Sequence, residues 1–174
     1  MNVIFLDIEG VMISFEREEE LFATDMIAKR EEFIKDKDPI YAEIPTTLLI
    51  FTAEGWDKEA IMLLRELLDR FEAKIVVSSS WQRLVPQEQL KALFAIHDLD
   101  KYLFGMTAGE KEGEKERCEE VKDFLDKHPE IDNFVIFDDN YVEGFKKCFP
   151  DNFVQTHNVL DRKNCLDAVM ILED

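Results

Sequence analysis

The stretch VIFLDIEG, residues 3–10, decides the fold because it joins a short apolar run to two acidic side chains and a glycine. Four apolar residues in succession are typical of a strand buried on both faces, and a glycine often marks where such a strand ends. Two similar runs follow, KIVV at 74–77 and NFVIF at 133–137. The first leads into three serines and the second into Asp138 and Asp139. We therefore predict three buried strands that each end in polar side chains.

Segments with helical periodicity separate these runs. Apolar residues recur every three or four positions from Asp57 to Phe71, after Pro86, before Pro129 and after Asp161, a candidate N-cap. Weaker strand candidates lie at 47–51, 102–106 and 153–156. Strands that alternate with helices predict an α/β domain, a Rossmann-like three-layer α/β/α sandwich with a mostly parallel sheet.

Residues 14–45 interrupt this alternation. Apolar residues between Leu21 and Ile34 predict a helix with one apolar and one charged face, inserted after the first strand. The insertion is either a small helical lid over the site or an elaborated first crossover. A second irregular stretch, 105–116, is rich in Gly, Glu and Lys and predicts a mobile loop.

Length and charge limit the class of protein. With 174 residues the chain suits a single domain, 1–174, and its formal net charge of −18 argues against general nucleic-acid binding. The N-terminus lacks the basic and apolar regions of a signal sequence, and no run approaches the roughly 20 apolar residues of a membrane span. The three cysteines match no zinc motif. We expect a cytoplasmic protein with free thiols and no membrane partner.

The polar strand ends are the candidate functional site. In open parallel sheets ligands bind beyond the carboxyl ends of the strands, which is where Asp7, Glu9, Asp138 and Asp139 fall. Clustered carboxylates repel one another and are stable mainly around a hard cation, so we expect Mg²⁺. The hydroxyl and backbone N–H groups of 78–80 can hold phosphate oxygens. Lysine and arginine side chains at 111, 115 and 117 precede a predicted helix whose start can direct one cation at the site.

These motifs resemble those of the haloacid dehalogenase-like (HAD) phosphohydrolase superfamily. FLDIEGVM is similar to its first motif, VVSSSW to its second and FVIFDDN to its acidic fourth, in the same order over nearly the whole chain. VVSSSWQR followed by ERCEEVKDFLDKHPEIDNFVIFDDN further resembles the compact HAD domains also found in multidomain RNA-repair proteins.

The resemblance implies a role for each motif residue. Asp7 is the expected nucleophile that forms an aspartyl-phosphate, and Glu9 stands in the general acid/base position. The metal is expected on Asp7, the backbone carbonyl of Glu9 and Asp138, with Asp139 orienting the metal-bound water or its neighbours. For the phosphate we expect Ser79 or Ser78, together with a cation supplied by Arg117, Lys115 or Lys111.

Glu9 departs from the family pattern, in which this position is usually Asp. Glutamate carries the same carboxyl group on a side chain one methylene longer, so its reach differs. The leading hypothesis is a Mg²⁺-dependent phosphatase that acts on a small phosphomonoester and is slowed by this change. No motif in the sequence identifies the substrate itself. Two alternatives stay open: a catalytically degenerate HAD-like binding domain, and a metal-dependent nuclease, which the net charge disfavours.

Overall fold

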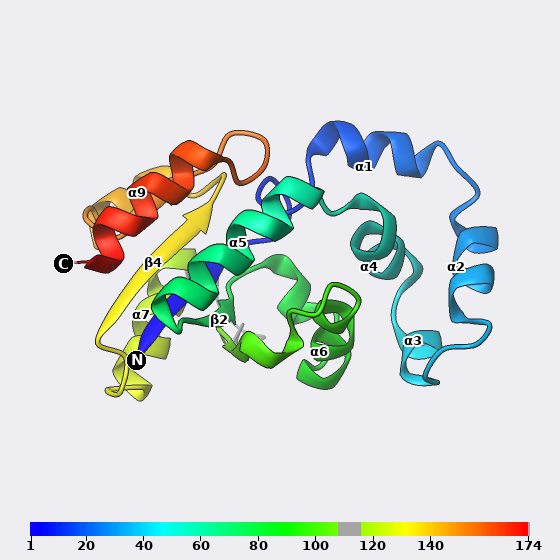
Figure 1. Ribbon diagram of the computed structural model, residues 1–174, viewed down its shortest axis with the longest axis horizontal. Helices are drawn as coiled ribbons and strands as arrows, with labels where there is room; N and C mark the ends of the chain where they lie inside the picture. The colour runs from blue at the N-terminus through cyan, green and yellow to red at the C-terminus, as the bar shows by residue number, and fades with distance from the viewer. Residues whose placement is uncertain (108–115, 174) are drawn as a thin grey trace.

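The computed structural model describes residues 1–107 and 116–173, and its centre is a parallel sheet (Figure 1). Within these residues the sheet has five strands in the order β3-β2-β1-β4-β5. Their bounds are Asn2–Leu6 for β1, Lys74–Val77 for β2, Leu103–Met106 for β3, Asn133–Asp138 for β4 and Phe153–Gln155 for β5. The strands expected at 3–6, 74–77, 102–106, 133–137 and 153–156 are thus confirmed.

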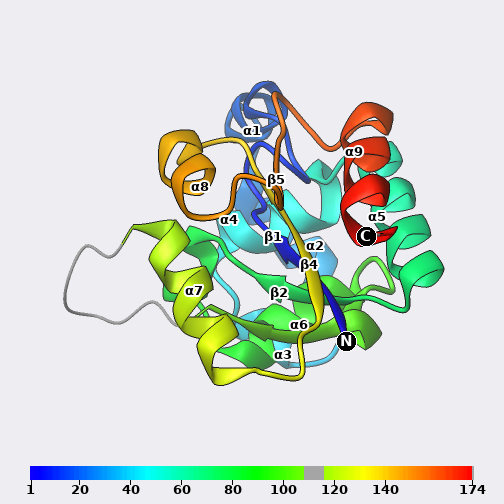
Figure 2. The same cartoon turned by 90° about the vertical axis from the view of Figure 1, so that its left-hand side faces the viewer.

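Helices cover both faces of this sheet, so the three-layer sandwich is confirmed. One face carries α5 (Lys58–Phe71), α6 (Gln87–Ala95) and α9 (Arg162–Glu173), and the other carries α7 (Arg117–Lys127) and α8 (Val142–Cys148). Figure 2 shows α5 and α9 on one side of the strands with α7 and α8 on the other. Asp161 caps α9 as expected, since its Oδ1 accepts the backbone N–H of Asn164 at 2.9 Å.

Each face of the sheet has its own hydrophobic core, because the side chains of β1 point alternately to the two faces. Ile4 and Leu6 pack with the face covered by α5, α6 and α9, whereas Val3 and Phe5 pack with the α7 and α8 face. All four are fully buried, which explains why the strand is continuously apolar. Because β1 is central, the residue that follows Leu6 lies in the middle of the sheet edge.

A helical insertion separates β1 from α5. It contains α1 (Phe15–Phe22), α2 (Met26–Ile34), α3 (Ile40–Glu43), α4 (Thr46–Ile50) and the π-helical turn η1 (Phe51–Gly55). In Figure 1 these helices form an arm beside α5 and α6. Tyr41 joins this arm to the body, because its hydroxyl donates to the carbonyl oxygen of Ala92 in α6 at 3.0 Å.

Three expectations for irregular or short segments need correction. The strand expected at 47–51 is wrong, because these residues form α4 and the start of η1; a short apolar run that is fully buried fits either structure. The helix expected between Leu21 and Ile34 is divided in two, because Asp25 caps a second helix by accepting the N–H of Ala28 at 3.0 Å. The loop expected at 105–116 begins later, because Gly105 and Met106 belong to β3. Most of its remainder lies outside the described residues.

Among the described residues, no helix combines the length and apolar character needed to cross a membrane.

Candidate functional site

Three carboxylates meet at the carboxyl edge of the sheet. Asp7 directly follows β1, Asp138 is the last residue of β4 and Asp139 follows it; one carboxylate oxygen from each lies within 4.8 Å of the others. The parallel register brings them together, because the Asp7 N–H donates to the Phe137 carbonyl oxygen at 3.0 Å. The sequence prediction that these acids converge is therefore confirmed.

Gly10 allows Asp139 to come this close. The backbone of Gly10 has a φ of +77°, and a Cβ built on it would lie 2.4 Å from Cγ of Asp139. Any larger residue would clash with that carboxyl group and strain the backbone. The carbonyl oxygen of Gly10 is fixed by the Thr156 hydroxyl, which donates to it at 2.7 Å from the end of β5.

One buried cation lies against the carboxylates. Arg117, the first residue of α7, is 9% exposed and places Nη1 3.4 Å from Asp7 Oδ1 and 3.5 Å from Asp138 Oδ2. The same nitrogen donates to the carbonyl oxygen of Ser78. Burial by itself lowers the Arg117 pKa, but the neighbouring Asp7 and Asp138 raise it above its usual value. Arg117 therefore stays charged and partly neutralises the acidic cluster.

Among the described residues, no cation other than Arg117 is paired with the acids of this cluster. Burial, followed by repulsion from Asp7, raises the pKa of Asp138 to about 8, and the same causes raise the pKa of Asp139. Burial likewise raises the pKa of Asp7, against the opposing effect of Arg117. Oδ2 of Asp138 is buried, and within the described ranges it accepts no hydrogen bond. Three carboxylates beside one arginine, with one oxygen unsatisfied, are a donor set suited to a hard divalent cation.

The serines after β2 have three different environments. The Ser79 hydroxyl donates a hydrogen bond to Asp7, which lowers the Asp7 pKa, and its side chain lines a cavity beside the cluster. Ser78 is buried, and no described residue forms a hydrogen bond with its hydroxyl. Ser80 is exposed and donates to Glu9 Oε2 at 3.2 Å. Both expected phosphate ligands thus lie at the sheet edge, and Ser79 is the one directly bonded to Asp7.

Glu9 lies at the border between the cluster and the insertion. It lines a cavity of about 380 Å³ together with residues of α4 and the segment after β2. Glu18, on α1, also comes close to this border: burial and the charges of Glu9 and Asp139 raise its pKa to about 7. Sequence reasoning missed Glu18, because only the path of the insertion brings this helix to the acids.

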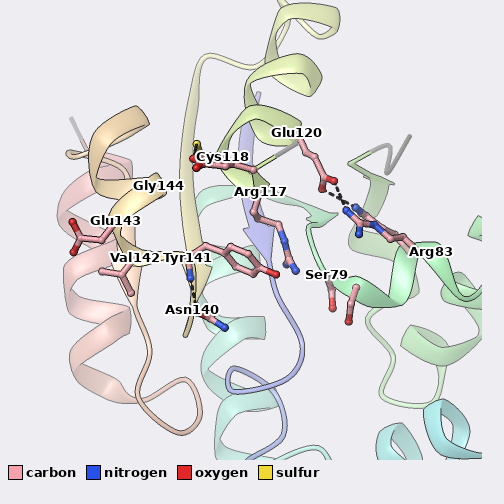
Figure 3. Close-up of a pocket in the computed structure, with 13 residues that line it drawn as sticks. Ser79, Arg83, Arg117, Cys118, Glu120, Asn140, Tyr141, Val142, Glu143 and Gly144 are labelled. Carbon is pink, nitrogen blue, oxygen red and sulfur yellow. Dashed lines mark hydrogen bonds and ion pairs between the residues drawn. The ribbon is translucent and has the colours of Figure 1, made fainter. Parts of the chain in front are cut away.

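Two expected cations cannot be placed, because Lys111 and Lys115 lie outside the described residues. Besides Glu18, the structure adds two residues that the sequence did not single out, Glu120 and Tyr141. Glu120 is buried in α7 and binds Arg83, while the ring of Tyr141 lies 4.7 Å from the Arg117 guanidinium carbon (Figure 3). In the sequence, Tyr141 directly follows the acidic fourth motif, as DDNY at 138–141. This position next to the motif was the one sequence feature that could have pointed to Tyr141.

With this geometry established, comparison with known proteins identifies the family. The family described as the HAD domain in Swiss Army Knife RNA repair proteins matches residues 3–160. The chain belongs to this family. The matched range of the HAD domain includes every carboxylate, serine and arginine of the site described above.

One of two similar solved structures supports the same fold. A candidate β-phosphoglucomutase from Thermotoga maritima shares 20% identity with a TM-score of 0.52, and the match covers 96% of this chain and 90% of that one. A haloacid dehalogenase-like family hydrolase from Streptococcus pneumoniae shares 12% identity with a TM-score of 0.48, over 96% and 90% of the two chains. No curated protein sequence matches the chain significantly. At such identities the first of these structures shows the fold alone.

Proposed function

We propose that this HAD domain is a Mg²⁺-dependent phosphatase that acts on a small phosphomonoester through an aspartyl-phosphate on Asp7. The observation that carries the proposal is the environment of Asp7. This buried carboxylate lies at the end of the central strand, 3.4 Å from a buried arginine and hydrogen-bonded to Ser79. Membership of a hydrolase fold family agrees with this chemistry.

The residues present fit a magnesium ion. Asp7 and Asp138 would hold it with the backbone carbonyl of Glu9, and Asp139 would orient its water ligands. The unsatisfied Oδ2 of Asp138 and the raised pKa values of the three acids support this assignment. When bound, the ion neutralises charge between carboxylate and phosphate, which otherwise repel each other.

The protein's own groups account for the rest of the reaction. An Asp7 oxygen attacks phosphorus, the bond from phosphorus to the ester oxygen breaks, and Glu9 gives its proton to the leaving oxygen. Arg117 and Ser79 hold the phosphoryl oxygens during this transfer. Glu9 then takes a proton from a water molecule that attacks phosphorus, which frees Asp7 and releases inorganic phosphate.

The decisive variant is Asp7→Asn. We expect hydrolysis of p-nitrophenyl phosphate in Mg²⁺ to fall by at least ~10³-fold in this variant, because an amide cannot act as the nucleophile. Wild-type activity should also disappear in EDTA. Phosphate release and the melting temperature should be measured together, so that loss of folding is recognised.

Asp126→Asn is the matched control, because Asp126 is an exposed acid on α7 remote from the motifs. It should hydrolyse the substrate at the wild-type rate. Activity retained in Asp7→Asn would contradict the nucleophile assignment. A wild-type protein that is inactive with all phosphomonoesters but melts higher in Mg²⁺ would instead be a binding domain.

A further inference from the structure

A cavity of about 810 Å³ opens beside the phosphate site (Figure 3). Within the described part of the chain, three segments line it: the chain after β2, the first turn of α7, and the loop that leads from β4 into α8. The lining residues that matter here are Ser79, Arg83, Arg117, Glu120, Asn140 and Tyr141. Because Ser79 and Arg117 also contact Asp7, a group in this cavity lies next to a phosphoryl group on Asp7.

Tyr141 presents an aromatic ring to this cavity. Its side chain is 48% exposed, and the Arg117 guanidinium carbon lies 4.7 Å from the ring centroid. The backbone of Tyr141 has a φ of 53°, a left-handed conformation that is unfavourable for a bulky residue. Its N–H donates to Asn140 Oδ1 at 2.9 Å, which helps to hold this conformation. Burial of the ring does not compensate for the strain, so packing alone does not explain a tyrosine here.

Arg83 presents a second flat group from the opposite wall. Its guanidinium is 56% exposed and donates to Glu120 Oε1 at 2.7 Å, while Glu120 is only 4% exposed. Glu120 is itself fixed, because its Oε2 accepts from Gln82 Nε2 at 3.1 Å and Gln82 Oε1 accepts from the Thr107 hydroxyl at 2.8 Å. Figure 3 shows Tyr141 and Arg83 on opposite sides of Arg117 and Ser79.

Among the residues that the structure describes, the charges lining the cavity favour an uncharged occupant. Glu116, Glu120 and Glu143 line it against the cations of Arg83 and Arg117, and both arginines are already paired with acids. A second anionic group on the substrate would therefore meet repulsion. A flat, uncharged ring with hydrogen-bond acceptors can instead stack on Tyr141 and accept from the exposed part of Arg83.

We infer that this cavity binds the leaving group of the substrate, and that this group is a nucleoside whose base stacks on Tyr141. The inference rests on the proposed phosphatase function and names its substrate class, a nucleoside monophosphate. Tyr141 is then a specificity-determining residue, and Glu120 is a positioning residue that acts through Arg83.

The test compares two phosphomonoesters that differ only in the base, adenosine 5′-monophosphate and ribose 5-phosphate. The variant is Tyr141→Asn, because asparagine tolerates the left-handed backbone but has no ring. We expect the ratio of kcat/KM for the nucleotide to that for the sugar phosphate to fall by ~10-fold, in the range of base–aromatic stacking. Tyr141→Phe should keep the wild-type ratio.

The matched control is Phe22→Ala, which removes an aromatic ring that is 60% exposed on α1, outside the cavity. It should leave the ratio unchanged. An equal loss for both substrates in Tyr141→Asn would overturn the inference, because it would indicate a merely structural role.

Binding separates failure of the inference from failure of the proposed function. Calorimetric titration of adenosine 5′-monophosphate in EDTA, where no hydrolysis is expected, should give a wild-type Kd that rises ~10-fold in Tyr141→Asn and stays unchanged in Tyr141→Phe. If no phosphomonoester is hydrolysed but this pattern appears, the phosphatase proposal fails and the nucleoside site stands. If the Kd does not depend on the Tyr141 ring, the nucleoside site is refuted.

Discussion

At the scale of single residues, the site depends on how closely side chains approach one another. Asp139 reaches the cluster only because Gly10 has no Cβ, and Asp7 keeps its place because its backbone N–H bonds to β4. Glu9, by contrast, binds Ser80 at the rim of the cluster. Its side chain is therefore held by the segment after β2, and in the proposed reaction it must leave this partner to act as general acid/base.

Gly10→Ala tests the close approach. We expect the free energy of unfolding to fall by more than about 1 kcal/mol, because alanine is strained at a positive φ and its methyl group overlaps the Asp139 carboxyl group. Urea denaturation measures the change. Gly105→Ala is the control, since its methyl group would meet only Phe124 at 3.5 Å. Equal stabilities of the two variants would show that the Asp139 contact is not tight.

At the scale of elements, α7 carries most of the organisation around the acids. Its first residue, Arg117, neutralises part of the cluster, and Glu120, one turn later, joins the helix to the segment after β2. These two residues lie on the same side of the helix, so one element positions both the cation and the wall of the cavity.

Glu120→Ala should destabilise the protein by about 1–3 kcal/mol, because it removes the acceptor of Gln82 and Arg83 in a buried setting. Glu119→Ala replaces the exposed neighbouring acid and should change stability by no more than ~0.5 kcal/mol. Urea denaturation of both variants measures the difference. A Glu120→Ala variant as stable as Glu119→Ala would mean that the network contributes nothing to the fold.

At the scale of the whole molecule, the acidic site opposes folding in the absence of metal. The pKa of Asp138 rises from 3.8 to about 8 and that of Glu18 from 4.5 to about 7 on folding. The folded state thus holds these protons more tightly than the unfolded state. The stabilisation that these two acids contribute in their protonated form is fully present below about pH 4, where they are also protonated in the unfolded chain. It is lost as the pH rises through their folded-state pKa values of about 7 and about 8.

We therefore expect the melting temperature in EDTA to fall by at least roughly 3 °C between pH 6 and pH 8.5, which corresponds to ~1 kcal/mol for a chain of this size. Mg²⁺ should raise it more at pH 8.5 than at pH 6, because protons compete for the same oxygens. Differential scanning calorimetry measures both. Asp138→Asn should weaken the dependence of the melting temperature on pH, whereas Asp126→Asn should not. If the melting temperatures of the two variants change with pH in parallel, Asp138 is not the group responsible.

The sequence by itself determined the parallel strands, most of the flanking helices and the identity of the acids at the strand ends. These features depend on local periodicity and on the rule that parallel strands end at one edge, both of which are readable along the chain. The apolar run at 47–51 shows where prediction from sequence fails, because a short buried helix and a short buried strand can have the same continuously apolar sequence.

Only the tertiary structure decided which distant groups meet. The approach of Glu18 to Glu9, the bond of Ser79 to Asp7 and the placing of Arg83 opposite Tyr141 depend on how the insertion, β2, α7 and the start of α8 pack against one another. No periodicity encodes such contacts, since each joins residues from separate elements. The acids and Arg117, as one of three candidate cations, were therefore found from sequence, whereas the pairing of Arg117 with Asp7 and Asp138 and the shape of the neighbouring cavity needed the folded chain.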